Sequence, residues 1–348
     1  MQQTETPSYR GLAKGEPVLR LPEVDEPIVL LDHQVTGPQA WTRDSVTPGE
    51  WVVSLTPAAV DELRNVVTRL RREPLPMLLL HPDRFELAES ARCMARIKEL
   101  LTAGMGLAVV DGLPMDEWSD EEAIAVYWLL GQFLATPVAT KWNGTMTYHV
   151  TDTGKRFGYG VRGSATNVEL SFHTDNAFGS TLPDYVGLLC IRPAATGGIS
   201  RFCSLYSVHN RMLAEHPDLL RRLYEPAYYD RQAEHAPDAP KVMTARMFRY
   251  DGRKLHARLV PGLIRRGYEM VDEPMDDQLV EALDQLARTI ADQSLWVEFT
   301  IERGQLQYLN NLECAHFRSA FTDSEDPERK RHLIRVWHRE IGAQTYDG

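Results

Sequence analysis

The 348-residue sequence has only four cysteines, and none of them forms a C-x-x-C pair. Zinc ribbons and thioredoxin-like chemistry therefore have no support, and we expect buried, reduced thiols as in cytoplasmic proteins. The sequence also lacks an apolar run that approaches the ~18 residues of a membrane helix. Its polar start lacks the apolar core of a secretory signal. These absences predict a cytoplasmic protein with no membrane partner.

Positive charge is scarce as well, because Lys and Arg number 38 against 49 for Asp and Glu, a formal net charge of −11. An acidic protein of this kind is a poor candidate for binding nucleic acid or an anionic membrane. The 43% hydrophobic content is ample for a sizeable core. Since no internal repeat or linker divides the chain, we predict a single domain over residues 1–348. The sequence leaves homo-oligomer formation open.

Hydrophobic periodicity divides the chain into an early helical part and a late part of short strands. Residues 1–50 are rich in Pro, Gly and acidic residues and predict an irregular arm. Helical spacing and capping signals predict helices over 58–72, 87–101, 119–134, 205–223 and 276–292. Short apolar or alternating runs predict strands over 106–110, 185–192, 199–204, 295–301, 304–310 and 332–339, with a hairpin at Asp251-Gly252.

This order of elements favours an α+β fold with a jelly-roll core and flanking helices. We predict that residues 1–105 form an arm and helices packed on the core, and that 106–348 form the core with helical insertions. Residues 139–170 mix Lys, Asn, Gly, Thr and aromatic residues without a period. Long aperiodic loops in compact domains are usually functional, so we expect a lid here, with a solvated insertion as the alternative.

A histidine and a carboxylate lie two positions apart at His173 and Asp175. Residues i and i+2 of a strand point to the same side, so both side chains can reach one ion. His316, in a probable strand far downstream, can supply a second imidazole. Two imidazoles and one carboxylate, with open positions beside them, form the metal site of non-haem Fe(II) oxygenases. The remaining histidines are expected to be structural.

Two further patterns follow the His-x-Asp pair. Gly197-Gly198-Ile199-Ser200 combines a tight turn with a hydroxyl at the start of a strand. Downstream of His316, alternation along a strand places Arg331 and Arg335 on one face among apolar neighbours. Two arginines that face a barrel interior need anions, and a dicarboxylate cosubstrate would supply them.

The order and spacing of these motifs resemble the TauD/TfdA-like, taurine dioxygenase type of Fe(II)/2-oxoglutarate-dependent oxygenase, over about residues 140–340. The resemblance implies a double-stranded β-helix (jelly roll) core. It implies iron held at a catalytic centre of His173, Asp175 and His316, with 2-oxoglutarate and O2 as cosubstrates. Ser200 and Arg331 match the residues that bind 2-oxoglutarate. Arg335 matches a second arginine that faces the cosubstrate or an anionic substrate, and the presence of Asp175 disfavours halogenation.

The expected function is therefore oxidation, above all hydroxylation, of a C–H bond in a small metabolite. Arg335 favours a substrate that carries a carboxylate, such as an amino acid, and the expected products include succinate from 2-oxoglutarate. Desaturation, epoxidation or cyclisation, a substrate tethered to a carrier protein, and a non-catalytic jelly-roll binder are the alternatives. Four residues are candidates to line the substrate pocket: Trp142, Tyr148, Asn167 and Phe178.

Overall fold

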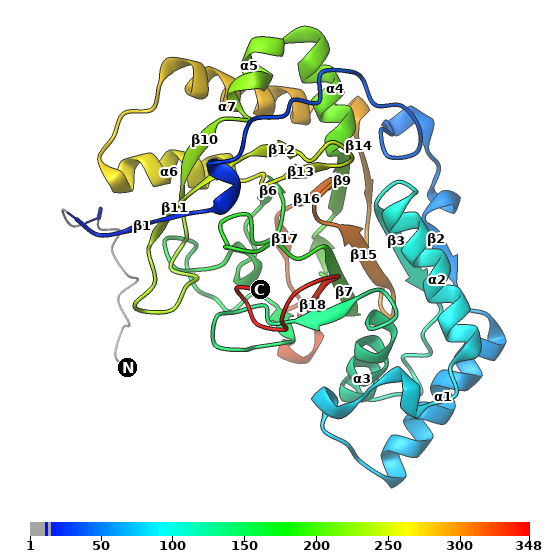
Figure 1. Ribbon diagram of the computed structural model, residues 1–348. Helices are drawn as coiled ribbons and strands as arrows, with labels where there is room; N and C mark the ends of the chain where they lie inside the picture. Colours follow the sequence, from blue (N-terminus) through cyan, green and yellow to red (C-terminus); the bar gives the residue numbers. More distant parts are fainter. Residues whose placement is uncertain (1–10, 13–14) are drawn as a thin grey trace.

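The computed structural model describes residues 11–12 and 15–348, and two β-sheets form its centre (Figure 1). The larger sheet has the strand order β2-β3-β15-β7-β18-β4, and β5 also pairs with β18. Its strands are β2 (Val52–Ser54), β3 (Leu107–Asp111), β4 (Thr136–Val138), β5 (Tyr148–Val150), β7 (Tyr185–Arg192), β15 (Leu306–Asn310) and β18 (His332–Arg339). The predicted strands 185–192 and 332–339 are confirmed with the same ends.

The smaller sheet has the order β14-β9-β16-β6. Its strands are β6 (Leu170–His173), β9 (Ser200–Ser204), β14 (Trp296–Phe299) and β16 (Cys314–Arg318). Val186 and Leu309 of the larger sheet share one buried apolar cluster with Phe202 and Val297 of the smaller sheet. The two sheets therefore face each other across a common core, which is the predicted jelly-roll arrangement.

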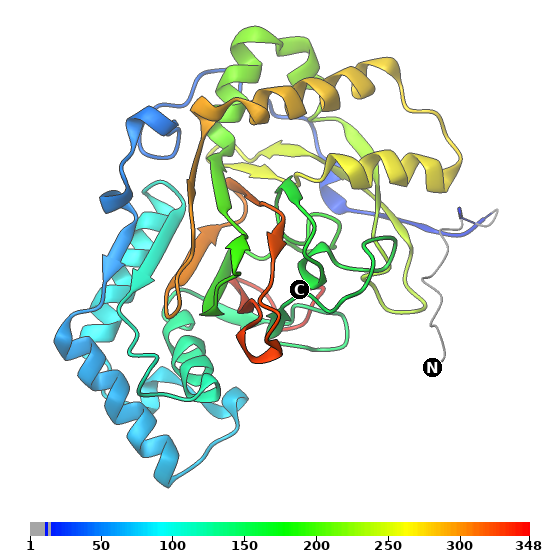
Figure 2. The same cartoon turned by 180° about the vertical axis from the view of Figure 1, so that it is seen from behind.

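Strand alternation explains how the larger sheet is covered on its other face. Leu107 and Val109 of β3 belong to the core between the sheets, whereas Ala108 and Val110 pack in a second cluster with the early helices. These helices are α1 (Pro57–Arg72), α2 (Ala88–Thr102) and α3 (Asp120–Gly131). Their predicted positions are confirmed, and they lie together at one end of the molecule (Figures 1 and 2).

The opposite end of the molecule carries the later helices α4 (Leu205–Glu215), α5 (Pro217–Arg222), α6 (Pro261–Val271) and α7 (Asp277–Ala291). They pack with a small sheet, β1 (Val18–Arg20)-β11 (Val242–Arg246)-β10 (Pro226–Asp230), and with the hairpin β12 (Phe248–Tyr250)–β13 (Leu255–Ala257). The prediction of one continuous helix over 205–223 was wrong, because Pro217 cannot continue a helix and instead starts α5. The sequence reasoning did not predict α6.

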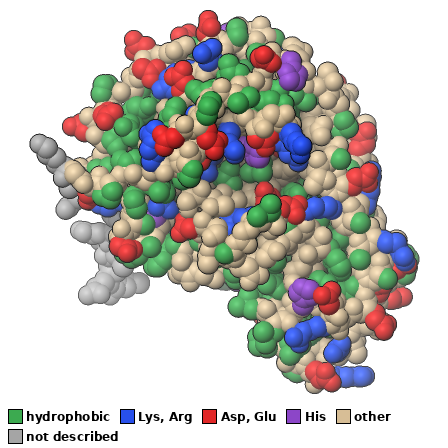
Figure 3. All heavy atoms as spheres, viewed as in Figure 1, with side chains coloured by type: hydrophobic (Ala, Val, Ile, Leu, Met, Phe, Trp, Pro, Cys, Tyr) green, Lys and Arg blue, Asp and Glu red, His purple; other side chains and the backbone are tan. Residues whose placement is uncertain are grey.

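Two features of the surface bear on the predicted partners. Acidic and basic side chains are interspersed on the face shown in Figure 3. No helix in the described part of the chain has the length and apolar character needed to cross a membrane. A single oxygenase domain over residues 1–348 remains our prediction.

Candidate metal centre and active site

Neighbouring strands bring the two predicted histidine ligands together. His173 ends β6, His316 lies in the middle of β16, and the two residues are direct partners in the antiparallel pairing of these strands. Their ring centroids are 4.2 Å apart. Asp175 follows two residues after β6, and its Oδ1 lies 3.7 Å from Nε2 of each imidazole. One ligand atom from each side chain fits within 4.8 Å of the other two.

Hydrogen bonding and burial leave the imidazoles ready to bind a cation. Nδ1 of His173 donates to the carbonyl of Ser171 (2.8 Å), so the lone pair of this ring lies on Nε2, toward Asp175. Burial lowers the pKa of His316 to about 3 and also lowers the pKa of His173. Both rings are therefore neutral near pH 7, which is the form that a metal binds.

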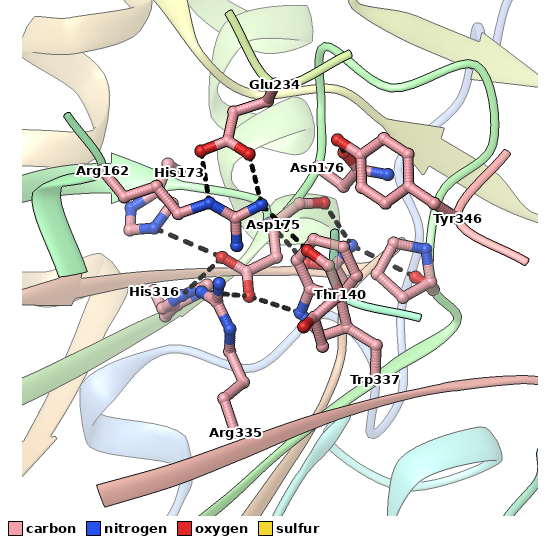
Figure 4. A network of polar contacts seen from close by, with 12 residues as sticks. Thr140, Arg162, His173, Asp175, Asn176, Glu234, His316, Arg335, Trp337 and Tyr346 are labelled. Carbon is pink, nitrogen blue, oxygen red and sulfur yellow. Dashed lines mark hydrogen bonds and ion pairs between the residues drawn. The ribbon is translucent and has the colours of Figure 1, made fainter. Parts of the chain in front are cut away.

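The two oxygens of the Asp175 carboxylate face different groups (Figure 4). Its Oδ2 accepts hydrogen bonds from Nη1 of Arg335 (3.0 Å) and Nε1 of Trp337 (2.8 Å), which leaves Oδ1 toward the imidazoles. Burial alone would raise the pKa of Asp175, but the charge of Arg335 and the two imidazoles hold it well below its usual range. The side chain is thus a fixed carboxylate with one free oxygen.

The backbone at Asp175 is also clamped. Its N–H donates to Oδ1 of Asn311 (2.7 Å), and Nδ2 of Asn311 donates back to the Asp175 carbonyl (2.9 Å). Asn311 is fully buried. The sequence reasoning missed the roles of Asn311 and Trp337, although both lie inside motifs that it used, five residues before His316 and two residues after Arg335.

Two neutral imidazole nitrogens and one carboxylate oxygen, open on one side, suit Fe(II). The opening leads into a cavity of about 520 Å3 that lies between the two sheets. Ser200, Arg331, Arg335 and Phe178, all predicted site residues, line this cavity. The donor set therefore fits a metal that keeps open positions for other ligands.

Both the backbone conformation and the lack of space for a side chain favour glycine in the Gly-Gly turn before Ser200. Gly197 and Gly198 have φ values of +74° and +68°, which favour glycine. A Cβ on Gly197 would lie 2.2 Å from the Ala320 carbonyl oxygen, and one on Gly198 would meet Nε of Arg331 at 3.4 Å. The turn thus lets the strand of Ser200 begin beside Arg331.

Three of the four candidate pocket residues do not line the cavity, and Phe178 does. Asn167 is exposed and its carbonyl accepts from the Phe321 N–H (3.1 Å), and the side chain of Trp142 is 46% exposed. Tyr148 is not part of the cavity lining either, but its ring centroid lies 5.0 Å from the guanidinium carbon of Arg335, which does line the cavity. Since Asp175 pairs with Arg335, the protein itself supplies one of the anions that the two cavity arginines need.

The loop 139–170 reaches the cavity through Arg162. This arginine forms a partly buried ion pair with Glu234 and donates to the Thr140 carbonyl (2.9 Å). Figure 4 shows its guanidinium between Glu234 and the Asp175 carboxylate. The loop is also less irregular than predicted, because β5 lies within it and pairs with β18.

Comparison with known proteins agrees with this site. The sequence model of the Taurine catabolism dioxygenase TauD, TfdA family matches residues 73–337. The chain belongs to the TauD/TfdA family. Its enzyme class is therefore that of an iron- and 2-oxoglutarate-dependent dioxygenase, as the resemblance implied.

Two curated relatives span most of the chain. FR-33289 synthase of Streptomyces rubellomurinus is 27% identical over 321 residues, which cover 89% of this chain and 91% of that protein. Taurine hydroxylase-like protein SAT17 of Stachybotrys chartarum is 25% identical over 320 residues, which cover 88% of this chain and 80% of that protein.

Solved structures show the same fold at low sequence identity. Asparagine oxygenase in complex with Fe(II), 3-hydroxyasparagine and succinate superposes with a TM-score of 0.61 at 21% identity, covering 83% of this chain and 93% of that one. The non-heme iron oxygenase OrfP with iron and α-ketoglutaric acid gives a TM-score of 0.60 at 18% identity, and the match covers 83% of this chain and 94% of that one.

Proposed function

We propose that this dioxygenase hydroxylates a C–H bond of a small, carboxylate-bearing metabolite such as an amino acid, at an iron held by His173, Asp175 and His316. The observation that carries the proposal is the cluster of these three side chains at the wall of a cavity between the sheets. Iron bound there would supply oxidative chemistry at a C–H bond, with 2-oxoglutarate and O2 consumed and succinate and CO2 released.

The residues of this chain bind and orient the reactants. Arg331 lines the cavity, is almost fully buried, and keeps Nη1 without a partner. Its guanidinium can grip the far carboxylate of 2-oxoglutarate, with the Ser200 hydroxyl beside it. Buried apolar walls, including Val186 and Phe202, exclude water from the interior of the cavity.

The substrate class follows from what remains unpaired near the iron site. Arg335 uses Nη1 for Asp175, but its Nε is buried without a partner. Nη1 of Arg162, on the other side of the cavity, has no partner either. Such donors favour a substrate with a carboxylate. The solved relatives carry a hydroxylated asparagine and hydroxylated arginines, which supports an amino acid as the substrate type.

The test is a screen of amino acids and small organic acids with protein that is loaded with Fe(II) and 2-oxoglutarate without oxygen and then aerated. Succinate formation coupled to loss of one substrate supports the proposal. The product mass separates hydroxylation or epoxidation, which add one oxygen atom, from desaturation or oxidative cyclisation, which remove two hydrogen atoms, and NMR of the product separates hydroxylation from epoxidation. His316→Ala should lack both tight Fe(II) binding and turnover while keeping its fold. Equal turnover in this variant contradicts the assigned metal site.

One observation favours a carrier-tethered substrate as a second candidate. Phe157 lines the cavity and is 50% exposed, and Trp142 on the same loop is 46% exposed. An exposed apolar edge beside an active-site opening is a feature of docking surfaces. Turnover of a carrier-bound thioester with no turnover of the free acid would support this candidate over a free metabolite.

A further inference from the structure

A third cavity arginine, Arg318, lies close to the proposed 2-oxoglutarate site. It follows His316 by two positions on β16, so both side chains point to the same face of the smaller sheet. In the strand pairing, Arg318 lies directly opposite Ser200 of β9. Directly opposed side chains on one face are neighbours, with Cβ atoms ~5 Å apart. Arg318 and Ser200 therefore share one end of the cavity, which both of them line.

Arg331 belongs to the same end of the cavity. The guanidinium carbons of Arg318 and Arg331 lie 4.8 Å and 5.0 Å from the ring centroid of Phe321. Two buried guanidinium groups thus gather around one aromatic ring and the Ser200 hydroxyl.

The hydrogen bonds of Arg318 use part of its guanidinium. Nη2 donates to the carbonyls of Thr166 (2.9 Å) and Val168, which fastens the end of the loop 139–170 to β16. Nε and Nη1 are buried and have no hydrogen-bond partner within the described part of the chain. A guanidinium that served only to hold the loop would not need these two nitrogens buried without acceptors.

The cavity arginines differ in their counter-ions. Arg162 pairs with Glu234, Arg266 with Asp230, and Arg335 with Asp175. Over residues 11–12 and 15–348, the structure shows no carboxylate ion-paired with the guanidinium of Arg318 or of Arg331. Two acids act on these arginines without an ion pair: Asp152 on Arg318, and Asp323 on Arg331, whose backbone N–H donates to Oδ1 of Asp323 (2.8 Å).

Two buried like charges without a counter-ion repel each other and lack the solvation of water. A carboxylate between them removes both costs, since its two oxygens accept several hydrogen bonds at once. Building on the proposed function, we propose that Arg318 and Arg331 together bind the far carboxylate of 2-oxoglutarate. Arg318 is then a cosubstrate-binding residue that makes the site select a dicarboxylate over a keto acid without a second acid group.

The test measures binding rather than turnover. Mn(II)-loaded protein without oxygen is titrated calorimetrically with 2-oxoglutarate and with 2-oxopentanoate, which has the same keto-acid end but no far carboxylate. Arg318→Gln should weaken 2-oxoglutarate binding by ~10–100-fold, the effect of losing hydrogen bonds to a charged group. Its affinity for 2-oxopentanoate should stay that of the wild type. Arg266→Gln, which removes a cavity arginine with its own acid, should leave both affinities unchanged.

Two results would overturn the inference. One is an unchanged 2-oxoglutarate affinity in Arg318→Gln while Arg331→Gln loses it, which keeps the proposed function and removes only Arg318 from it. The other is an equal loss for both keto acids, which assigns Arg318 to holding the loop. If Arg318→Gln does not fold, Arg318→Lys keeps a cation and should show a smaller loss that is again confined to 2-oxoglutarate. A wild type that binds both keto acids equally contradicts the proposed function as well.

Discussion

Replacing Trp337 with Phe tests how the fold prepares Asp175 for a metal. The indole Nε1 donates to Oδ2 of the carboxylate at 2.8 Å, in a fully buried setting. Phe keeps most of the aromatic packing but removes this N–H group. A buried hydrogen bond to a charged acceptor contributes ~1.5–3 kcal/mol. Without it, Asp175 keeps one partner for Oδ2, Arg335, and can rotate away from the imidazoles.

If the free energy of this hydrogen bond is lost from the metal-bound state, the affinity for the metal should fall by ~10–100-fold. This is the usual effect of removing a group that orients a metal ligand. The assay is a calorimetric titration of the protein with Mn(II) or Fe(II) in the absence of oxygen. The matched control is Trp41→Phe, which removes a similar buried bond, from Nε1 to the Met105 carbonyl at 2.7 Å. This control should lower stability and leave metal affinity unchanged. Equal metal affinity in Trp337→Phe and wild type would refute the reasoning.

Three further predictions concern the cosubstrate, the turn and pH. Arg331→Ala should raise the apparent Michaelis constant for 2-oxoglutarate strongly, because a broken buried charge pair costs ~3–5 kcal/mol. Arg331→Lys should raise it less. An unchanged dependence of succinate formation on 2-oxoglutarate would contradict the proposed role of Arg331. Gly197→Ala should lower the free energy of unfolding in urea by ~1–3 kcal/mol and by more than Gly144→Ala, since Gly144 also has a positive φ but open space at its Cβ. His338 is buried with a pKa lowered to about 3, so the unfolded chain takes up its proton near pH 6.5 and the folded chain does not. Stability is therefore lost as the pH falls, by about 2 kcal/mol between pH 7 and 5 for this residue, and urea unfolding of His338→Gln should lack that share of the pH dependence.

The sequence predicted those parts of the site that depend on local geometry. His173 and Asp175 reach one site as their spacing predicted, although only His173 lies in β6 and Asp175 follows the strand. Arg331 and Arg335 both line the cavity, although Arg331 directly precedes β18. The jelly-roll core followed from the order of helices and strands and from the family resemblance. These inferences succeed because period and spacing are properties of the chain itself.

Partnerships between distant segments could not be predicted in this way. Nothing in the motifs indicates that Arg335 contacts Asp175, because that contact joins β18 to the loop after β6 and depends on how the two sheets pack. The clamp by Asn311 is of the same kind. Asn167 is exposed and does not line the cavity, because its place in the loop before the His173 strand does not determine its side-chain direction.

Helix boundaries failed for a different reason. Pro261 and Gly262 open α6, and a Pro-Gly pair more often marks a turn, so the helix behind it was missed. In contrast, Pro at the first helical position is favourable because its missing N–H has no partner there in any case. The same rule explains why α5 begins at Pro217.

The distribution of the site over the two sheets has a consequence for assembly. The imidazoles belong to the smaller sheet, whereas Arg335 and Trp337 belong to β18 of the larger sheet and Arg331 directly precedes that strand. Neither sheet alone holds a complete binding site, and the Asp175 carboxylate bridges the seam between them. The complete site for metal and cosubstrate therefore exists only where the two sheets pack face to face, because the groups that hold Asp175 in place and the arginine expected to bind the far carboxylate come from the β18 side.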